Sequence, residues 1–528
     1  MAKEFNINSI PKEKLALANL GDHIKDQKFD DKPVGYFKDA WRRFCKNKAS
    51  IVAAIIILVI VLFAIIFPFF DKGTGTTLDT YYDKKGPRNL FLSQYGMLTG
   101  DVNMDMNERA YILEIAKGIG ASSDFENIPT IGEALNSGDP LQPVTSLVEV
   151  KQIQQGKKFN NIYFTTIDEY VSVGFIYKQV SQDEYKKMVA WQEETGIQLL
   201  YPLINKTDCF DEKDANYWYK TDSKGNPKKT NSSGNTVVMK YDDVHEITLE
   251  DNYLRDEEGN LRYWAYQGGG STVETAEYKV RVLYYNYYRY THNTAEPEFI
   301  FGTDSTGYDL AYRIAIGLRL SLILAVSIFA INFILGAIYG AIEGYYGGTT
   351  DLVMEFISYV LSGVPFMVTA TLFQIHLAAK AGPVASLLFA FVLTGWIGTA
   401  SLVRTQFYRF KNQEYVMAAR TLGAKDWRVI WKHIFPNTLG TIITSSVLAI
   451  PGVIFSESML SYLGIINLGG ADSTSLGTLL SDASKIYTSV PHLMLFPAIF
   501  ISLLMICFNL FGNGLRDAFN PSLRGTED

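Results

Sequence analysis

LSLILAVSIFAINFILGAIYGAI, residues 320–342, has no charged side chain. A helix rises about 1.5 Å per residue, so a run of this length can cross the roughly 30 Å hydrocarbon core of a bilayer. Outward from it lie five further apolar stretches of similar length: 49–70, 352–379, 383–403, 439–463 and 493–510. We therefore predict an all-α polytopic membrane protein with six transmembrane helices.

The overall composition excludes several other classes of protein. The 528 residues carry a net charge of −7, with 48% hydrophobic and 20% charged residues. This is too apolar for a disordered chain, and a nucleic-acid binder would have a basic excess. The three cysteines lack CxxC spacing, so neither a disulfide scaffold nor a metal centre is predicted.

Residues 71–298, between the first two apolar stretches, hold the whole acidic excess. We predict that they form an inserted α+β domain, because a segment of this length can bury its own core. The predicted strands are 161–166, 172–180, 236–241, 246–250, 261–266 and 277–290, and the predicted helices are 106–117 and 182–194. The tyrosines of YYNYYRY, residues 284–290, suit either a contact surface for a partner or strand residues in the core. His245 and His292 lack the spacing of metal ligands.

Lys and Arg near the span ends predict the orientation. They cluster before the first span, between the fourth and fifth, and after the sixth: Lys38, Arg42, Arg43, Lys46 and Lys48; Arg404, Arg409, Lys411, Arg420, Lys425, Arg428 and Lys432; Arg516 and Arg524. Both termini are therefore expected in the cytoplasm and the insertion outside. The predicted parts are a cytoplasmic segment with an interfacial helix (1–48), a retained first span (49–70), the insertion (71–298), an external segment (299–319), spans two to six (320–515) with a cytoplasmic loop (404–438), and a cytoplasmic tail (516–528).

The interfacial helix is predicted from the approach to the first span. Phe37, Trp41, Phe44 and Cys45 share one helical face, and charged side chains take the other. The alternative is a merely basic sequence that precedes the span.

The loop between spans four and five contains EYVMAARTLGAKDWRVIWKHIFPN, residues 414–437. We predict a short helix that Asn412 caps and Gly423 ends, with Glu414 near its positive end and a low surface at Ala418 and Ala419. A second helix, 425–433, is expected to end before Pro436. Such a loop can fit a groove in a partner protein, although these patterns alone also suit an ordinary amphipathic loop.

This loop resembles the EAA loop of ABC-type importer permeases, in the branch of the oligopeptide permease C type. Further motifs share the resemblance, which spans about 34–70 and 301–524: GTDSTGYD (302–309) with Arg313, Gly317 and RLSL (319–322), GYYGG (344–348), ESMLSYLG (457–464) and GNGLRD (512–517) with Pro521. The family residues of the first motif are Gly302, Thr303, Asp304, Gly307, Asp309, Arg313 and Arg319. Departures from the family pattern are Tyr308, Asn513, Leu476 and the insertion itself.

The resemblance implies a type I ABC importer permease fold and a subunit that forms half of a membrane pathway for oligopeptides. ATPase coupling would rest on Glu414, Ala418, Ala419, Arg420, Gly423 and Ala424. The implied partners are two cytoplasmic ATPase subunits, a second permease subunit of the oligopeptide permease B type, an extracellular peptide-binding lipoprotein, the peptide and membrane lipid, in a bacterial cell membrane, with no nucleic acid.

The chain itself is not expected to be an enzyme. It lacks the phosphate-binding pattern GxxxxGK[ST], and GKK at 156–158 is the nearest fragment. No cofactor is predicted in this chain, because ATP and Mg would be bound by the partner subunits. A membrane-anchored enzyme would need a catalytic motif, and neither G-x-S-x-G nor H-E-x-x-H is found.

Polar residues inside spans are costly in lipid and are expected to face the bundle interior or a wet pathway. The candidates are Asn332, Gln374, His376, Glu457 and Asn509. Glu457 is equally compatible with a structural hydrogen bond between helices. Two other functions stay open: a receptor whose external domain binds a ligand, and an importer of dipeptides, nickel or other small solutes.

Overall fold

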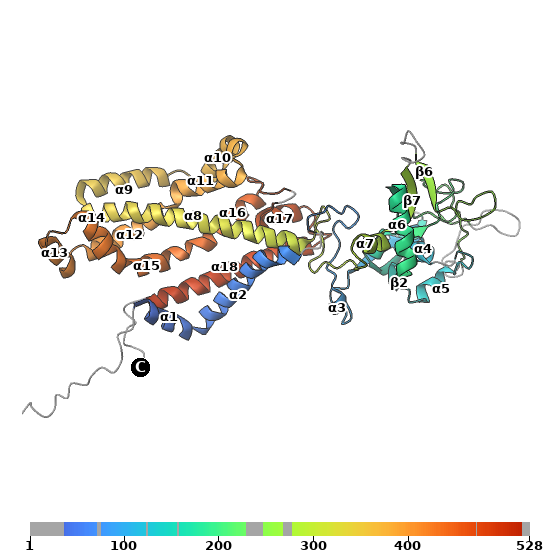
Figure 1. Ribbon diagram of the computed structural model, residues 1–528, viewed down its shortest axis with the longest axis horizontal. Helices are drawn as coiled ribbons and strands as arrows, with labels where there is room; N and C mark the ends of the chain where they lie inside the picture. The colour runs from blue at the N-terminus through green and yellow to red at the C-terminus, as the bar shows by residue number, and fades with distance from the viewer. Residues whose placement is uncertain are drawn as a thin grey trace, which may run out of the picture.

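The structure is a computed structural model that describes residues 36–70, 75–122, 125–155, 158–228, 247–267, 277–470 and 473–519. Figure 1 shows an elongated molecule with a helical bundle at one end and a separate α+β body at the other. This arrangement confirms the predicted fold class of a polytopic helical protein that carries an inserted α+β domain.

Five helical segments in the described part of the chain are long and apolar enough to cross a membrane: Lys48–Phe70, Leu310–Tyr346, Pro383–Phe410, Asp426–Tyr462 and His492–Phe519. The predicted third span is instead a pair, α9 (Gly348–Ser362) and α10 (Phe366–Ala381), bent by 72°. Gly363 and Pro365 lie at this break, where proline lacks the N–H that would continue the helix. The six predicted stretches therefore correspond to five long apolar helices and one bent helix pair.

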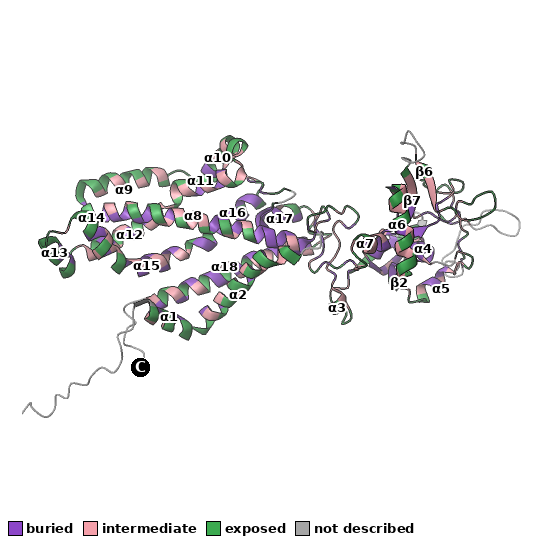
Figure 2. Ribbon diagram, in the orientation of Figure 1, coloured by how far each residue is buried: buried purple, intermediate pink, exposed green. Residues whose placement is uncertain are grey.

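The other spans are made from α2 (Lys48–Ile66), which η3 (Phe67–Phe70) prolongs; α8 (Leu310–Tyr346); α11 (Pro383–Gly395) with α12 (Ile397–Phe410); α15 (Phe435–Val447) with α16 (Ala449–Tyr462); and α18 (His492–Phe519). The short α17 (Leu476–Ala483) packs against α16 and α18. The helix α8 packs against α2, α12 and α16 and is thus the centre of the bundle. Figure 2 shows exposed residues along α9, none of whose residues is buried.

Two helix boundaries differ from the sequence prediction. The helix α8 begins at Leu310, ten residues before the apolar run, because the Asp309 carboxylate accepts the N–H of Ala311 at 2.8 Å and caps the helix. The helix expected to end before Pro436 instead continues from α14 (Asp426–Arg428) through a π-helical turn, Val429–Ile434, into α15. That prediction was wrong because the wider π turn accommodates a proline without the usual clash with the preceding turn.

The insertion contains two small antiparallel sheets. The first has the order β1 (Asp101–Asn107), β3 (Lys158–Asp168) and β2 (Val144–Gln155). In the second, β7 (Glu277–Leu283) pairs with β4 (Phe175–Val180), β5 (Leu200–Tyr201) and β6 (Trp264–Gln267). The helices are α3 (Leu90–Ser93), α4 (Glu108–Ala121), α5 (Ile131–Asn136), α6 (Gln182–Thr195) and α7 (Tyr284–Thr291), and an aromatic core around Trp218 joins most of these elements.

The predicted helices near 106–117 and 182–194 are confirmed as α4 and α6. The strand predicted over 277–290 is only half correct, since it ends at Leu283 and the tyrosine run forms α7. Tyr284, Tyr285 and Tyr288 are buried there, so these three rings belong to the core, which was the second of the two alternatives. Thr248 makes only an isolated bridge in the region predicted as strand 246–250. The predicted strand 236–241 and His245 lie outside the described residues.

The N-terminal helix α1 (Tyr36–Lys46) forms at the predicted place. Ala40 and Phe44 are buried against the bundle, while Trp41 and Cys45 of the predicted membrane-facing side are exposed. Phe44 contacts Phe511 of α18 edge-on, with ring centroids 5.5 Å apart. The side of α1 that carries Ala40 and Phe44 therefore packs on the bundle.

Candidate functional site

The short helix of the loop between spans four and five is α13 (Glu414–Thr421). Its N-cap residue is Gln413, whose side chain makes no capping hydrogen bond, so the predicted Asn412 cap is wrong. The predicted stop at Gly423 is present: its φ of +82° is a conformation that glycine adopts without strain. The N–H groups of Gly423 and Ala424 donate to the carbonyls of Arg420 and Ala419 at 2.9 and 3.0 Å. These bonds satisfy carbonyls that the helix end leaves free.

The two faces of α13 have different surroundings. Val416 belongs to a buried apolar cluster formed with α8, α12 and the π turn: Ala337, Ala341, Tyr345, Val403, Phe407, Val429, Ile430, Ile434 and Ile442. Ala419 is also buried. Elsewhere the loop exposes Met417 on α13, Leu422 directly after it and Trp427 on α14, which are 52%, 88% and 66% accessible. Large apolar side chains this exposed within one short loop indicate a protein contact surface; we call these three residues the loop patch.

Tyr345, at the end of α8, fixes the loop to the bundle. Its hydroxyl donates to the Asp426 carboxylate at 2.6 Å, and the Arg420 guanidinium lies 5.0 Å from the centre of its ring. The tyrosine thus contacts residues on both sides of Gly423. Sequence reasoning missed this role, although Tyr345 lies in the quoted GYYGG motif.

Arg404 of α12 lies among three carboxylates near the same end of the bundle. It pairs with Asp351 at 2.6 Å, Glu355 at 3.0 Å and Glu343 at 3.4 Å. These acids come from α8 and α9, so the network links three helices. The sequence had suggested only an orientation signal for Arg404, because the spacing of these four residues along the chain does not predict their meeting.

The five predicted pathway residues differ in burial and in hydrogen-bond partners. Glu457 is 1% exposed and accepts hydrogen bonds from Ser321 at 3.0 Å and Ser461 at 3.1 Å. Asn332 is buried where α8 meets Gly395. Gln374 accepts a hydrogen bond from the Ser386 hydroxyl at 2.6 Å.

His376 and Asn509, in contrast, lie on the exposed surface of this chain. The five residues therefore differ in their burial within this chain.

The family motif residues 302–309 form a joint between the insertion and the bundle. The side-chain hydroxyl of Thr303 accepts a hydrogen bond from the backbone N–H of Lys85 at 2.8 Å. The backbone N–H of Thr303 donates to the carbonyl of Lys85 at 3.0 Å. Gly302 and Gly307 have φ values of +80° and +91°, and a Cβ on either would collide with the backbone of Lys85 or Asp79. Glycine is required here both by conformation and by close approach.

The motif also connects to the bundle. Arg313 pairs with Asp304 at 3.5 Å and donates to the Gly470 carbonyl at 3.0 Å. Arg319 is exposed on α8.

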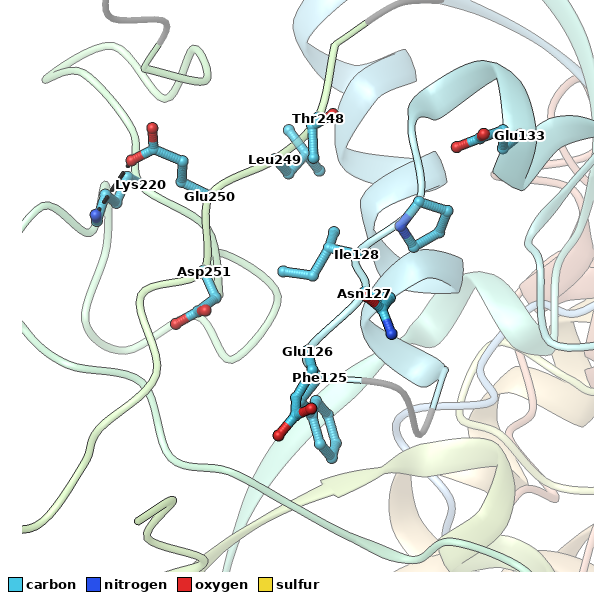
Figure 3. Close-up of a pocket in the computed structure, with 11 residues that line it drawn as sticks. Phe125, Glu126, Asn127, Ile128, Glu133, Lys220, Thr248, Leu249, Glu250 and Asp251 are labelled. Carbon is cyan, nitrogen blue, oxygen red and sulfur yellow. Dashed lines mark hydrogen bonds and ion pairs between the residues drawn. The ribbon is translucent and has the colours of Figure 1, made fainter. Parts of the chain in front are cut away.

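The insertion carries a groove of about 750 Å³, shown in Figure 3. Its wall presents Glu126, Glu133, Glu250 and Asp251 with one cation, Lys220, which pairs with Glu250 at 3.2 Å. The described residues contain no group of His, Cys, Asp and Glu side chains that could hold a metal ion. The acidic groove is thus a surface feature without the geometry of a metal site.

Comparison with known proteins finds a family match on each side of the insertion. Residues 334–525 match the family model of the binding-protein-dependent transport system inner membrane component, and residues 35–87 match the N-terminal transmembrane domain of oligopeptide transport permease C. The second match extends through the segment that packs on the 302–309 motif. Most of the insertion lies between the two matched regions.

Three curated relatives are similar over about half of this chain or somewhat less. The oligopeptide transport system permease protein OppC of Bacillus subtilis is 41% identical over 42% of this chain and 72% of its own length. OppC of Haemophilus influenzae is 42% identical over 44% of this chain and 73% of its own. The dipeptide transport system permease protein DppC of Lactococcus lactis is 36% identical over 51% of this chain and 74% of its own. With both family models matched on either side of the insertion, the chain belongs to the OppC-type permeases of binding-protein-dependent transport systems.

Proposed function

We propose that this chain forms half of the membrane pathway of an ATP-driven importer of oligopeptides or dipeptides. The observation that carries the proposal is the α13 loop, which buries Val416 and Ala419 and exposes the loop patch. A movement of α13 would be transmitted to α8 through Tyr345 and to α12 through Phe407. Such a loop can couple a nucleotide-driven partner to a rearrangement of the spans.

The partners follow from the family and from the surface of the chain. A binding-protein-dependent permease implies an ATPase and a binding protein. We propose that one of two cytoplasmic ATPase subunits binds the loop patch and that a second permease subunit covers part of the apolar surface that α9 exposes. A peptide-binding lipoprotein would approach from the side of the insertion.

The proposed orientation has both termini in the cytoplasm. In Figure 1, α13 and α1 lie at one end of the bundle, and the insertion lies beyond the other end. A cytoplasmic ATPase site at α13 would therefore leave the insertion outside. Replacement of exposed Ser223 by cysteine, in a chain without Cys45 and Cys209, should allow labelling of intact cells by a membrane-impermeant maleimide. Labelling only after lysis would show that the insertion lies in the cytoplasm, opposite to the proposed orientation.

Coupling is tested by Leu422→Asp and Met417→Asp, with Lys485→Ala at an exposed distant position as the control. A charge on the loop patch should prevent apolar contact, so ATPase subunits should no longer copurify and peptide uptake should fail. Gly423→Val and Glu414→Lys should have the same effect by straining the helix stop and by reversing a favourable helix-dipole interaction. Normal ATPase assembly in all four variants would disprove the coupling role.

The role proposed for the insertion, docking of the binding protein, is tested by removing it. Arg88 and Phe299 exchange backbone hydrogen bonds of 2.8 and 3.0 Å, so the cut ends are already neighbours. Deletion of residues 89–298 with a short glycine linker should therefore leave the 302–309 joint paired with Lys85. We expect assembly with the ATPase to persist and delivery by the binding protein to fall. Uptake at the normal rate would show that the insertion is dispensable.

A further inference from the structure

A second cavity of the insertion, of about 640 Å³, lies between the ends of α4 and α6, the loop before β2, and α7. It is separate from the groove of Figure 3, with which it shares no lining residue. Its volume lies within the range of about 300–1,000 Å³ that is usual for small-molecule sites. Several polar side chains converge on it from different elements.

Most polar groups of this cavity are already paired within the insertion. Arg88 pairs with Asp168 at 3.2 Å, and the Tyr201 hydroxyl donates to the Ala121 carbonyl at 3.0 Å. The Gln192 side-chain carbonyl accepts the N–H groups of Leu199 and Leu200. Their partners within the insertion hold these side chains in place beside the other polar groups that line the cavity.

Two atoms of α7 stay without a hydrogen-bond partner among the described residues. Asn286 is 2% exposed, and its amide nitrogen donates to the Gln198 carbonyl at 2.7 Å. That bond assigns the amide orientation, and it leaves the Asn286 Oδ1 as a buried acceptor with no donor. The Nε of Arg289 is a buried donor with no acceptor. A buried polar group without a partner costs free energy, so each favours a ligand group of the opposite kind.

The charges of the cavity wall indicate the chemistry of that ligand. Arg289 supplies a positive charge, and Asp139 and Glu296 supply negative ones, whereas Arg88 is compensated by Asp168. A guanidinium suits a carboxylate, because it donates through a planar fork. The amide oxygen of Asn286 and the nearby carboxylates suit an ammonium group.

We propose that this cavity binds a small zwitterion with a free carboxylate and a free ammonium, an α-amino acid or a short peptide. Arg289 holds the carboxylate, and Asn286 with Asp139 and Glu296 holds the ammonium. The site belongs to the insertion, outside the two regions that match the family models. Its binding step does not depend on transport, so failure of the proposed import function would leave it testable.

The test is calorimetric titration of the full chain in lipid nanodiscs with trialanine, with alanine, and with trialanine that is either N-acetylated or C-terminally amidated. Saturable binding of trialanine or alanine is expected, and the better ligand identifies peptide or amino acid as the source of the zwitterion. Each cap should weaken binding about tenfold or more, the effect of losing a hydrogen bond to a charged group.

Variants separate the two ends of the ligand. In Arg289→Gln, amidation should no longer matter while acetylation still weakens binding, and Asn286→Leu should show the opposite pattern. Lys220→Gln, in the other groove, is the matched control and should bind as the wild type does.

The capped ligands test the unaltered protein, so the proposal does not depend on folding of the variants. Absence of saturable binding by both trialanine and alanine, or equal binding of the capped and free peptides, would overturn it.

Discussion

Replacement of Tyr345 by phenylalanine tests whether the end of α8 holds the coupling loop. The change removes the 2.6 Å hydrogen bond to Asp426 and keeps the ring below Arg420. A hydrogen bond to a charged group contributes about 1.5–3 kcal/mol. Because Asp426 is exposed, water can replace part of the bond, and we take the lower value. About 1.5 kcal/mol corresponds to a roughly tenfold shift from the docked toward the undocked loop.

Tyr345→Ala removes the ring as well. The ring is 6% exposed within the cluster of Val416 and Phe407, so its loss should cost about 3–5 kcal/mol, the range for large aromatic truncations. Tyr346→Phe is the matched control, since this neighbouring tyrosine is 54% exposed. We therefore expect coupling in Tyr346→Phe to equal that of the wild type. Coupling in Tyr345→Phe should be intermediate, and coupling in Tyr345→Ala should be the lowest.

The assay is ATP hydrolysis by the reconstituted transporter, with and without its binding protein and peptide. The ratio of the two rates measures coupling, and thermal unfolding of each variant measures folding. Tyr345→Phe should lower the ratio several-fold with little loss of thermal stability. A ratio within the error of the wild type would refute the hydrogen bond as the anchor and leave only the packing of the ring.

Three further results are expected. Gly307→Ala should open the joint and expose residues 79–88 to protease, because the new Cβ collides with the Asp79 carbonyl and φ is +91°; unchanged digestion would contradict this. Arg404→Met should destabilise the bundle by about 3–5 kcal/mol in thermal unfolding, because three carboxylates lose their counter-ion, whereas Arg409→Met should not; equal melting of the two variants would exclude the network. Burial raises the pKa of the Cys209 thiol, so at neutral pH a smaller fraction is thiolate and maleimide labelling should lag behind that of Ser223→Cys until the pH exceeds the Cys209 pKa; equal rates at pH 7 would argue against the shift.

The insertion illustrates where local pattern failed. The alternation of YYNYYRY is compatible with a strand, yet residues 284–291 are helical. Tyr284, Tyr285 and Tyr288 at helical spacing bury three rings in the core that contains Tyr82 and Phe299. Tertiary packing outweighs local preference in such a run, because aromatic residues are compatible with either backbone when their rings are buried.

The sequence by itself determined the membrane class, the apolar spans, the presence of an α+β insertion and the stop at Gly423. These depend on run length, on composition and on a glycine whose φ no other residue adopts as easily. Only the tertiary structure decided that Tyr345 reaches Asp426, that Arg404 meets acids of α8 and α9, and that the 302–309 motif packs on residues near Lys85. Such contacts join residues far apart in the chain, and side-chain charge or size alone does not say which distant groups the packing of helices will bring together.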